Sequence, residues 1–379
     1  MATNKEQNKQ NVPHLRFPEF HGEWCVSTIG EQFDLYSGNT PSRLNKEHFE
    51  GNVNWITSGE LKEHYISDTK EKISEDAATA NNLKLLHPGT FVIAIYGLEA
   101  DGVRGTGSIT CKESTISQAC MAFTQKGDVK NEFLYSWYKK HGNIIGIKYA
   151  QGTKQQNLSY DILEKFHIAF PSQDEQDKLI KFISLLDERI ATQSKLIEKL
   201  ESLIKGIAQK IVRNKPNVRL AECLECKSST LQESEVCEQG TYTVYGANGI
   251  VGYLDKYSTE GEAVYIIKDG SGVGTVSYVM GKCSATGTLN TLQAKEGYSL
   301  QYFYYLLKVF NFEPYKTGMA IPHIYFKDYG KAKVFCPSFT EQLRYARLLS
   351  AIDNKLSAEQ HILTNLSLQK QYLLRQMFI

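Results

Sequence analysis

Residues 171–212 read PSQDEQDKLIKFISLLDERIATQSKLIEKLESLIKGIAQKIV, and residues 337–377 read PSFTEQLRYARLLSAIDNKLSAEQHILTNLSLQKQYLLRQM. The second stretch repeats the first at a constant offset of 166 residues, without a gap. The matching pairs are Tyr149 with Tyr315, Gly152 with Gly318, Pro171-Ser172 with Pro337-Ser338, Glu175-Gln176 with Glu341-Gln342, Asp187 with Asp353, Ile197 with Leu363, Leu200 with Leu366, and Ile207 with Leu373. A repeat of this kind predicts a duplicated architecture.

Both stretches carry apolar residues at alternating steps of four and three, the spacing of a coiled-coil seam. The seam residues of the first stretch are Leu179, Ile183, Leu186, Ile190, Ile197, Leu200, Ile204, Ile207 and Ile211, with Gln193 in the slot between Ile190 and Ile197. Those of the second are Tyr345, Leu349, Ile352, Leu356, Leu363, Leu366, Leu373 and Met377, with Glu359 at the slot of Gln193 and Lys370 at that of Ile204. A polar residue at one shared seam position sets pairing and register at some cost in stability.

The shared frame predicts that the two helices pair with each other. The residues predicted to make this pairing are Leu186, Ile190, Gln193, Ile197, Leu200, Ile352, Leu356, Glu359, Leu363 and Leu366. Two unrelated amphipathic helices, each packed on its own domain, remain the alternative interpretation.

The length of the first helix predicts how the parts are arranged. A helix from Glu175 to Val212 would be about 57 Å long at 1.5 Å per residue, and the RNKPN run at residues 213–217 would end it. The next domain, of roughly a hundred residues, has a radius of gyration near 13 Å and must fold at the far end of this rod. If the seams bury one another, the second helix therefore runs back antiparallel. The expected result is a dumbbell with pseudo-two-fold symmetry.

The predicted fold class is α+β, with two mixed α/β globular parts separated by two long antiparallel coiled-coil helices. The globular parts are expected at residues 13–150 and 217–314, and the helix regions at 151–216 and 315–379. Strand-like runs, such as 90–96, 263–268 and 275–280, are punctuated by glycine. Residues 268–275, KDGSGVGT, are followed by a strand pattern and lack the spacing of a phosphate loop. They predict a glycine-rich hairpin, with a comparable turn at 102–108.

The composition argues against a membrane-spanning chain. Hydrophobic residues make up 41% and charged residues 22% of the 379 residues, and no apolar run approaches the roughly 18 residues that a span needs. The first dozen residues are polar and lack the apolar core of a signal peptide, so we expect a frayed tail and a cytoplasmic protein.

Cysteine spacing offers one candidate metal site. Cys223 and Cys226 form a C-x-x-C, and Cys237 and Cys283 follow, which together could supply three or four zinc ligands. The second half of the usual paired spacing is missing, and no His-x-x-His follows. We therefore expect buried, inert thiols and no metal in this chain.

Net charge gives little support to nucleic-acid binding. The chain carries a net charge of +1, and residues 217–313 hold seven basic and eleven acidic side chains, a local balance of −4. A nucleic-acid binder usually shows a basic excess. Either the basic residues of this part cluster on one face, or partner proteins supply much of the affinity for the DNA backbone.

Several motifs nevertheless resemble the specificity subunits of type I restriction-modification systems. They are GNTPSR at 38–43, WITSGEL at 55–61, SQA at 117–119, GTKQQNLS at 152–159, PSQDEQ at 171–176, YGANGIVG at 245–252, TGTLN at 286–290 and PSFTEQ at 337–342. Their order covers nearly the whole chain, twice, and this order is the specific signal.

The resemblance implies two target-recognition domains that each read one half of a bipartite, asymmetric site in double-stranded DNA. It also implies that the helices act as a ruler and dock two methyltransferase subunits, with two restriction subunits as possible further partners. S-adenosylmethionine, ATP and Mg²⁺ would belong to those partners, and this chain would hold no cofactor. A spacer of about 57 Å exceeds one DNA turn of about 34 to 36 Å, so unread bases would lie between the half-sites.

The candidate DNA contacts are polar residues in predicted loops. They are Thr40, Ser42, Arg43, Lys46, Thr57, Ser58, Arg104, Lys154, Gln155, Gln156, Tyr245, Asn248, Lys268 and Ser271. Arginine can fork onto guanine and Asn or Gln onto adenine, whereas Lys, Ser and Thr more often contact phosphate. The alternative for each is a turn-forming or solvated residue.

Two other classes of function compete with this hypothesis. An amino-methyltransferase would need an Asn-Pro-Pro or Asp-Pro-Pro turn, and the chain has no Pro-Pro pair. A translocase would need the missing phosphate loop, and the nuclease-like tripeptide at Glu225-Cys226-Lys227 has no convincing carboxylate partner upstream. An adaptor whose globular parts bind protein or carbohydrate would use the 22 tyrosines equally well.

Overall fold

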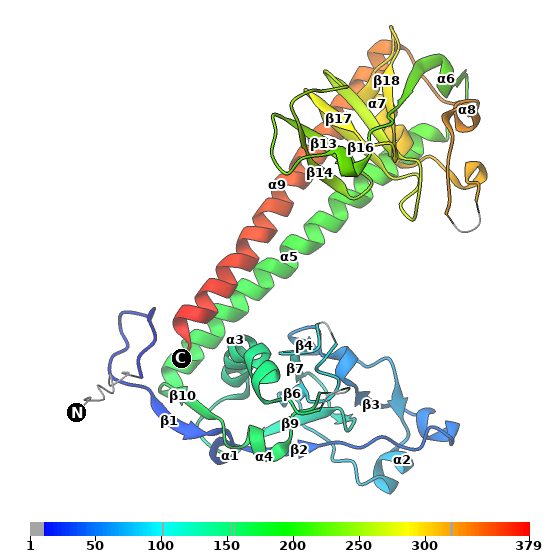
Figure 1. Cartoon of the computed structure of the whole chain (residues 1–379). Coiled ribbons are helices and arrows are strands. Elements are labelled where there is room, and N and C mark those ends of the chain that lie inside the picture. The colour runs from blue at the N-terminus through cyan, green and yellow to red at the C-terminus, as the bar shows by residue number, and fades with distance from the viewer. Residues whose placement is uncertain (1–10, 101, 153, 155, 319–320) are drawn as a thin grey trace. The chain divides into compact units, whose positions relative to one another are not determined.

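The computed structural model describes residues 11–100, 102–152, 154, 156–318 and 321–379 and divides into two compact units (Figure 1). The first unit comprises Met1–Ala191 with Thr364–Ile379, and the second comprises Thr192–Leu363. Each unit contains one globular part and one half of each of two long helices. We call the globular part at residues 11–172 the first head and that at 213–338 the second head.

The two long helices are α5 (Gln173–Val212) and α9 (Phe339–Met377). The helix predicted from residue 175 thus begins two residues earlier and ends where it was expected. Asn214 closes the last turn of α5, because its Nδ2 donates to the carbonyl oxygen of Ile211 at 2.8 Å. Ser338 caps α9, since its Oγ accepts from the backbone N of Glu341 at 3.4 Å and donates to the Glu341 carboxylate at 2.7 Å.

The long helices run antiparallel. In the first unit, Ile183 of α5 shares a hydrophobic core with Leu374 of α9. In the second unit, Ile204 of α5 shares a core with Leu349 of α9. Early α5 therefore packs with late α9, and late α5 packs with early α9.

The residues predicted to pair the helices are buried or half-buried. Gln193, Ile197, Leu356 and Glu359 are buried, and the half-buried ones are Leu186, Ile190, Leu200, Ile352, Leu363 and Leu366. Gln193 Nε2 donates to the backbone oxygen of Glu359 at 3.1 Å and to its carboxylate. Lys355 forms an ion pair with the same carboxylate. The polar slot thus contains a satisfied hydrogen-bonded group between apolar layers.

The first head contains ten strands among its described residues. They are β1 (Cys25–Thr28), β2 (Phe33–Ser37), β3 (Val53–Ile56), β4 (Tyr65–Ile66), β5 (Lys72–Ile73), β6 (Phe91–Ala94), β7 (Gly107–Thr110), β8 (Ser114–Ile116), β9 (Cys120–Gln125) and β10 (His167–Phe170). They form a five-stranded sheet in the order β2-β9-β6-β7-β4, a three-stranded sheet β5-β3-β8 and the pair β1-β10. The helices are α1 (Ile29–Gln32), η1 (Lys46–Phe49), η2 (Ser58–Glu60), α2 (Glu75–Ala80), α3 (Asn131–Tyr149) and α4 (Tyr160–Leu163).

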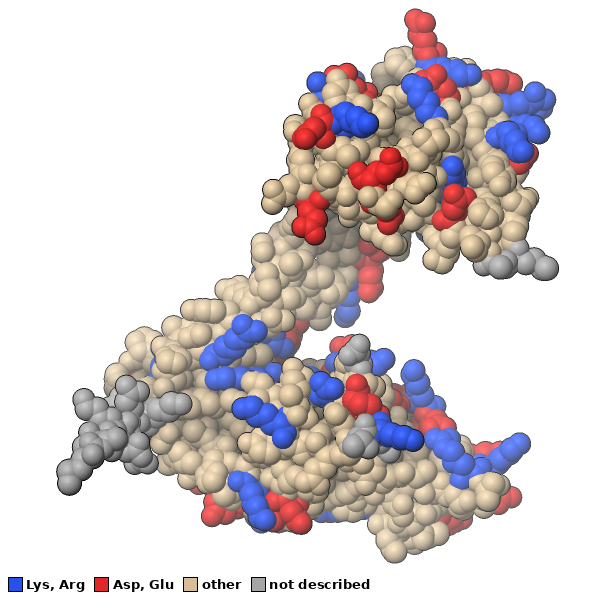
Figure 2. All heavy atoms as spheres, in the orientation of Figure 1, with Lys and Arg blue, Asp and Glu red and all other residues tan. Residues whose placement is uncertain are grey.

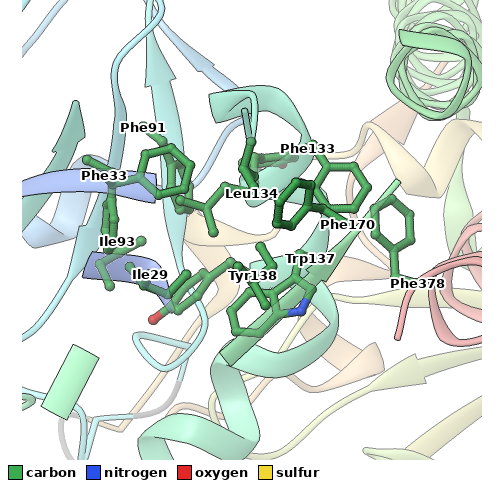
Figure 3. Close-up of a cluster of buried hydrophobic side chains, with 14 of the residues drawn as sticks. Ile29, Phe33, Phe91, Ile93, Phe133, Leu134, Trp137, Tyr138, Phe170 and Phe378 are labelled. Carbon is green, nitrogen blue, oxygen red and sulfur yellow. The ribbon is translucent and has the colours of Figure 1, made fainter. Parts of the chain in front are cut away.

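The core of the first unit lies between α3 and the five-stranded sheet. Phe91 from β6 and Phe133 from α3 lie in one buried cluster, together with Phe170 from β10 (Figure 3). Phe378, which directly follows α9, joins this cluster with its ring centroid 5.2 Å from that of Phe133. Burying a phenylalanine side chain contributes about 1.5–3 kcal/mol. The same apolar burial therefore stabilises the head and holds the end of α9 against it.

The second head repeats this plan with fewer strands. Its strands are β11 (Val218–Arg219), β12 (Leu224–Ser228), β13 (Tyr242–Gly246), β14 (Gly249–Leu254), β15 (Glu262–Ile267), β16 (Val276–Met280), β17 (Cys283–Ala285), β18 (Leu289–Ala294) and β19 (Lys333–Val334). They form the sheets β12-β18-β15-β16 and β14-β13-β17 and the pair β11-β19. The helices are α6 (Leu220–Cys223), η3 (Glu233–Glu235), α7 (Leu300–Lys308), η4 (Glu313–Tyr315) and α8 (Phe326–Tyr329).

The two heads correspond strand by strand. The order β12-β18-β15-β16 matches β2-β9-β6-β7, and β13-β17 matches β3-β8, with both of these last pairs parallel. The predicted hairpin at 268–275 connects the antiparallel strands β15 and β16, and the predicted turn at 102–108 leads into β7. The repeat first seen in the helices thus extends through both heads as a structural duplication.

A buried glutamine joins each long helix to its head. Gln176 Oε1 accepts from the backbone N of Lys130 at 3.0 Å, and its Nε2 donates to the carbonyl oxygens of Asp128 and Pro171 at 3.1 and 3.0 Å. Gln342, its repeat partner, accepts from the backbone N of Ser299 at 2.9 Å and donates to Pro337 O at 2.9 Å. Each glutamine therefore satisfies the start of the helix that covers its sheet, α3 or α7.

Replacing Gln176 with leucine should loosen the first head selectively. The variant leaves one backbone N–H and two carbonyl groups without this partner, which costs about 2 kcal/mol or more. We expect faster amide hydrogen exchange at the start of α3 and unchanged exchange in α7. The matched variant Gln342→Leu should show the reverse. Equal loss of protection in both heads after either substitution would contradict this local role.

The pair Gln193 and Glu359 should favour one register of the two long helices and contribute little to the free energy of unfolding. Gln193→Leu leaves the buried Glu359 carboxylate with fewer donors, so thermal unfolding should shift down, by a free energy of about 1–3 kcal/mol. The double variant Gln193→Leu, Glu359→Leu should recover this loss, because a well-packed apolar layer can replace a buried polar pair. A double-mutant cycle of unfolding free energies, measured by circular dichroism, tests this. Additive losses of stability in the double variant would contradict the prediction.

Candidate nucleic-acid interface

In the first head, the predicted loop residues Thr57 and Ser58 lie at the carboxyl ends of two parallel strands. Thr57 and Ser58 follow β3, and Ser117 and Gln118 follow β8, which pairs with β3 in parallel. Parallel strands end at the same edge, so these loops are neighbours, and the backbone N of Ser117 donates to Ile56 O at 2.9 Å. Thr57 and Glu60 form a capping turn, with Thr57 N donating to the Glu60 carboxylate at 2.9 Å.

The GNTPSR segment is held across the same edge. Trp55 is buried, and its Nε1 donates to the carbonyl oxygen of Asn39 at 3.1 Å. Gly38 passes so close to β8 that a Cβ there would lie 1.8 Å from Ile116 O, which only glycine avoids. Thr40 Oγ1 donates to the side chain of the exposed Gln118. The structure therefore joins Thr40 to Gln118 and places both Thr57 and Ser58 at the same sheet edge.

Gln118 is the residue that sequence reasoning missed here. It lies within the SQA block at 117–119, so the signal was present. The block was interpreted as a marker of the family and not as a contact. Only the parallel pairing of β3 with β8 shows that Gln118 shares an edge with Thr57.

Arg43 lies beside this edge and already has partners. Its guanidinium makes two hydrogen bonds of 2.8 Å to the Glu71 carboxylate and stacks over the rings of Phe49 and Trp55 at 4.9 and 5.6 Å. Hydrogen bonding to Arg43 holds the pKa of Glu71 below its usual range. The side chain is still 57% exposed, so DNA could compete with Glu71 for it. Ser42 and Lys46 are exposed and lie, like Arg43, in the segment between β2 and β3.

Arg104 differs from the other candidates because it is turned toward its own head. Its Nε donates to the carbonyl oxygen of Leu98, and its aliphatic part would lie 3.2 Å from a Cβ built on Gly146 of α3. Gln156 is next to this turn, since its carbonyl oxygen accepts from Leu98 N at 3.0 Å. Lys154 is exposed, and Gln155 lies outside the described residues.

The second head has the same edge with different side chains. Tyr245 is the last residue of β13 that pairs with β17. The backbone N of Thr286 donates to the carbonyl oxygen of Tyr245 at 2.8 Å. The hydrogen bond from Ser117 N to Ile56 O is its equivalent in the first head. Asn248 follows in the exposed β13–β14 turn. The Tyr245 ring packs 5.6 Å from that of Tyr265, and burial raises the pKa of Tyr245. Tyr245 is therefore a neutral hydroxyl donor at this edge.

The glycine-rich turn lies next to that edge. Lys268 N donates to Thr288 O at 3.0 Å, which joins the turn to the segment after β17, and Ser271 is exposed at its tip. His323, a second residue that sequence reasoning missed, approaches Asp269 of this turn with its Nδ1 2.7 Å from the carboxylate. The repeat gave a signal for it, because His323 lies 166 residues after Asn157 of the GTKQQNLS motif.

The second head shows both signs of charge on its surface. On the face drawn in Figure 2, acidic and basic side chains are interspersed over the second head. The local excess of acidic residues therefore has no opposing basic patch on that face. No group of three His, Cys, Asp or Glu side chains suited to a metal occurs in the part of the chain that the structure describes, and within it no helix is long and apolar enough to cross a bilayer.

A half-buried charged cluster connects the first head with both long helices inside the first unit. His64 stacks between Tyr65 and Tyr135, with ring centroids 4.1 and 3.9 Å away. Its Nε2 lies 2.8 Å from the Glu132 carboxylate of α3, and its Nδ1 lies 3.5 Å from the Asp187 carboxylate of α5. Asp187 also forms an ion pair with Lys370 of α9. The imidazole thus contacts α3 and α5, and Asp187 links it to Lys370 of α9.

This cluster shifts the protonation of its members. Burial alone lowers the pKa of His64, but hydrogen bonds to Asp187 and Glu132 outweigh it and raise that pKa above the ordinary 6.5. Burial raises the pKa of Asp187, but its hydrogen bonds to His64 and Lys370 outweigh this and lower it below 3.8. Burial lowers the pKa of the neighbouring Lys139 to about 8.

Both halves of the chain match one known family of protein domains. The profile of the type I restriction modification DNA specificity domain matches residues 21–202 and, again, residues 214–368. The chain belongs to the specificity-subunit family of type I restriction-modification systems. Each match takes in one head and extends into the helix that follows it, in agreement with the repeat. The motifs that resemble this family are thus found in a chain that is a member of it.

Relatives of this specificity subunit share the arrangement at low identity. The EcoprrI specificity subunit of Escherichia coli is 23% identical over 370 residues, which cover 87% of each chain. The MjaIX specificity subunit of Methanocaldococcus jannaschii is 28% identical over 185 residues, which cover 48% of this chain and only 42% of that subunit. The S subunit of M. genitalium, in a crystal structure, superposes with a TM-score of 0.68 at 22% identity, covering 97% of this chain and 99% of that one.

A structure from a study of type I complex assembly and conformational transition is also similar. It superposes with a TM-score of 0.57 at 15% identity and covers 94% of this chain and 97% of that one. Identities this low support a shared fold.

The His64 cluster should make stability depend on pH. The contribution of His64 is full below pH 6.5 and is lost as pH rises through its raised pKa, whereas that of Asp187 is present above pH 3.8 and is lost as pH falls through its lowered pKa. His64→Phe keeps the stacking but not the charge, so it should destabilise by about 1 kcal/mol near pH 5 and by less at pH 9. Urea unfolding at both pH values measures this. The exposed His87→Phe serves as the control, and a pH-independent loss would refute the charged cluster.

Proposed function

We propose that this specificity subunit carries no catalysis of its own and reads a bipartite, asymmetric site in double-stranded DNA, one half with each head. The observation that supports this most directly is the duplicated edge, in which loops after two parallel strands gather polar side chains in each head. Loops on a rigid sheet edge are well suited to carry recognition residues. The edges are equivalent in backbone and different in side chains, as two different half-sites require.

The difference between the edges is specific. Thr57, Ser58 and Gln118 in the first head correspond to Gly246, Ala247 and Gly287 in the second, which places its polar groups instead at Tyr245 and Asn248. An amide side chain can form two hydrogen bonds with adenine in the major groove, and hydroxyl groups bind bases or phosphates. Gln118 and Asn248 are therefore the first candidates for contacts with bases.

We further propose that the long helices dock two methyltransferase subunits. Leu185 and Leu203 of α5 and Leu348 and Tyr372 of α9 are between 49% and 58% exposed, although the helices bury their shared seam. These exposed apolar side chains are available to pack against another protein. Partner subunits would bring S-adenosylmethionine, ATP and Mg²⁺, with two restriction subunits where the system cleaves DNA. They would also supply basic residues that offset the net negative charge of the second head. The complex would act in the cytoplasm, where the DNA is.

Methylation mapping tests this function directly. Genomic DNA from cells with and without this gene, with the methyltransferase gene expressed in both, is sequenced by a method that detects adenine methylation. Loss of methylation at one split motif on deletion is expected. An unchanged methylome would overturn the proposal and favour an adaptor that binds protein or carbohydrate.

Variants of the two edges should change the two halves of the motif separately. Gln118→Ala should relax specificity at a base in one half-site, and Asn248→Ala at a base in the other, because each lost amide contact removes about 1–3 kcal/mol of discrimination. The measurement is the methylated motif in cells that carry each variant. Lys165→Ala, near the base of the first head, is a control that should leave the motif unchanged. The same half-site changed by both variants would contradict the division between heads.

A further inference from the structure

Leu44 of the first head is almost completely exposed. It lies in the segment between β2 and β3, and 97% of its surface is accessible. Among the large apolar residues that the structure describes, the next highest value is 75%, for Met280. Because apolar stabilisation depends on area removed from water, Leu44 contributes almost nothing to the core of its own head. Its side chain is therefore available to a ligand.

The turn that carries Leu44 is held on both sides. Before it, Arg43 makes two hydrogen bonds of 2.8 Å to the Glu71 carboxylate. After it, the backbone N of Asn45 donates to Ser42 O at 3.3 Å, which closes a turn around Leu44. The Asn45 side chain also caps η1, the short helix that follows. The turn is thus formed before any ligand arrives, so binding costs little further ordering of the backbone.

This turn lies near the recognition edge of the first head. Thr40, four residues before Leu44, donates to the side chain of Gln118 at that edge. Four residues of chain span at most about 14 Å. Successive base pairs of DNA are about 3.4 Å apart. Leu44 therefore lies within about four base-pair steps of any base that Gln118 contacts.

The residues around Leu44 favour DNA over a protein as its partner. Residues 42–47 are all exposed, and every one of them except Leu44 is polar or charged. A protein interface usually has several apolar anchors clustered at its centre. One apolar side chain among polar ones suits instead a single apolar group on a polar, anionic surface. In the major groove that group is the C5-methyl of thymine, and the exposed Lys46 can contact a phosphate nearby.

The second head shows that the fold does not require an exposed leucine here. Its equivalent segment lies between β12 and β13, at residues 229–241. The large apolar residues of that segment, Leu231 and Val236, are half-buried. The segment has no lysine or arginine and carries three glutamates. The leucine beside two basic residues is therefore a feature of the first head alone, as expected for a residue that reads one half-site.

We propose that Leu44 packs on the 5-methyl group of a thymine in the major groove, in or beside the half-site that the first head reads. The inference rests on the proposed function and adds a specificity-determining residue to it. The polar side chains of the edge cannot detect this methyl group by hydrogen bonding, whereas an apolar side chain gains by burying it. Leu44 thus complements the hydrogen bonds expected from Gln118.

Removal of single methyl groups from the DNA tests this contact. The chain is purified with its methyltransferase subunits, and fluorescence anisotropy gives Kd for duplexes that carry the motif found by methylation mapping. Thymines in the first half-site and within about four base pairs of it are replaced one at a time by deoxyuridine, which lacks the methyl group and pairs in the same way. We expect one replacement to weaken binding about fourfold, the effect of one buried methyl group.

Variants of Leu44 identify the side chain that senses the methyl group. Leu44→Asn keeps the approximate size but not the apolar character, so it should bind the thymine duplex about fourfold more weakly and be indifferent to the deoxyuridine replacement. Leu44→Met should retain most of the sensitivity. Leu85→Asn is the matched control, because Leu85 is 44% exposed and adjoins Leu86, which pairs with Ser114 at the opposite end of β8 from Gln118. This control should behave like the unmodified chain.

The outcomes separate this inference from the proposed function. If the complex prefers the motif to a scrambled duplex but tolerates every deoxyuridine, or if Leu44→Asn stays as sensitive as the unmodified chain, only the methyl contact is overturned. A Leu44-dependent rise in the fluorescence of 2-aminopurine placed in the site would indicate a wedge between bases, and it would overturn the methyl contact as well. No preference for the motif would overturn the proposed function and this inference together.

Discussion

The burial of one apolar seam between α5 and α9 is the constraint on which the rest of the molecule depends. A slip of either helix would bring the Gln193 amide against leucine or isoleucine and separate the Glu359 carboxylate from that amide. Because an unsatisfied buried polar group costs about 1–3 kcal/mol, this pair favours one register over others that the apolar residues alone would accept.

That register also decides where each head attaches. Gln176 and Gln342 lie near the starts of their helices and hydrogen-bond the first turns of α3 and α7, which in turn cover the sheets. The His64 cluster adds a second connection in the first unit, where Asp187 contacts both the head and Lys370 of α9. The heads are thus joined to the helices by buried polar groups of high directionality, and the loops at the sheet edges are free to differ.

Because the attachments to the helices are fixed and the edge loops are variable, one duplicated backbone can carry two different recognition surfaces. Backbone hydrogen bonds recur from head to head, as in Ser117 with Ile56 and Thr286 with Tyr245, so the edge is in the same place in both. The side chains there do not recur.

The sequence by itself determined the duplication, the two long helices, their antiparallel seam and the family, because these depend on periodicity and on residues at constant offsets. It also marked most of the edge loops through their glycine and proline motifs. Only the tertiary structure decided that Gln118 contacts Thr40 and that Arg104 is turned toward α3 of its own head. Such contacts arise from strand pairing between distant segments, and no local pattern encodes which strands will pair.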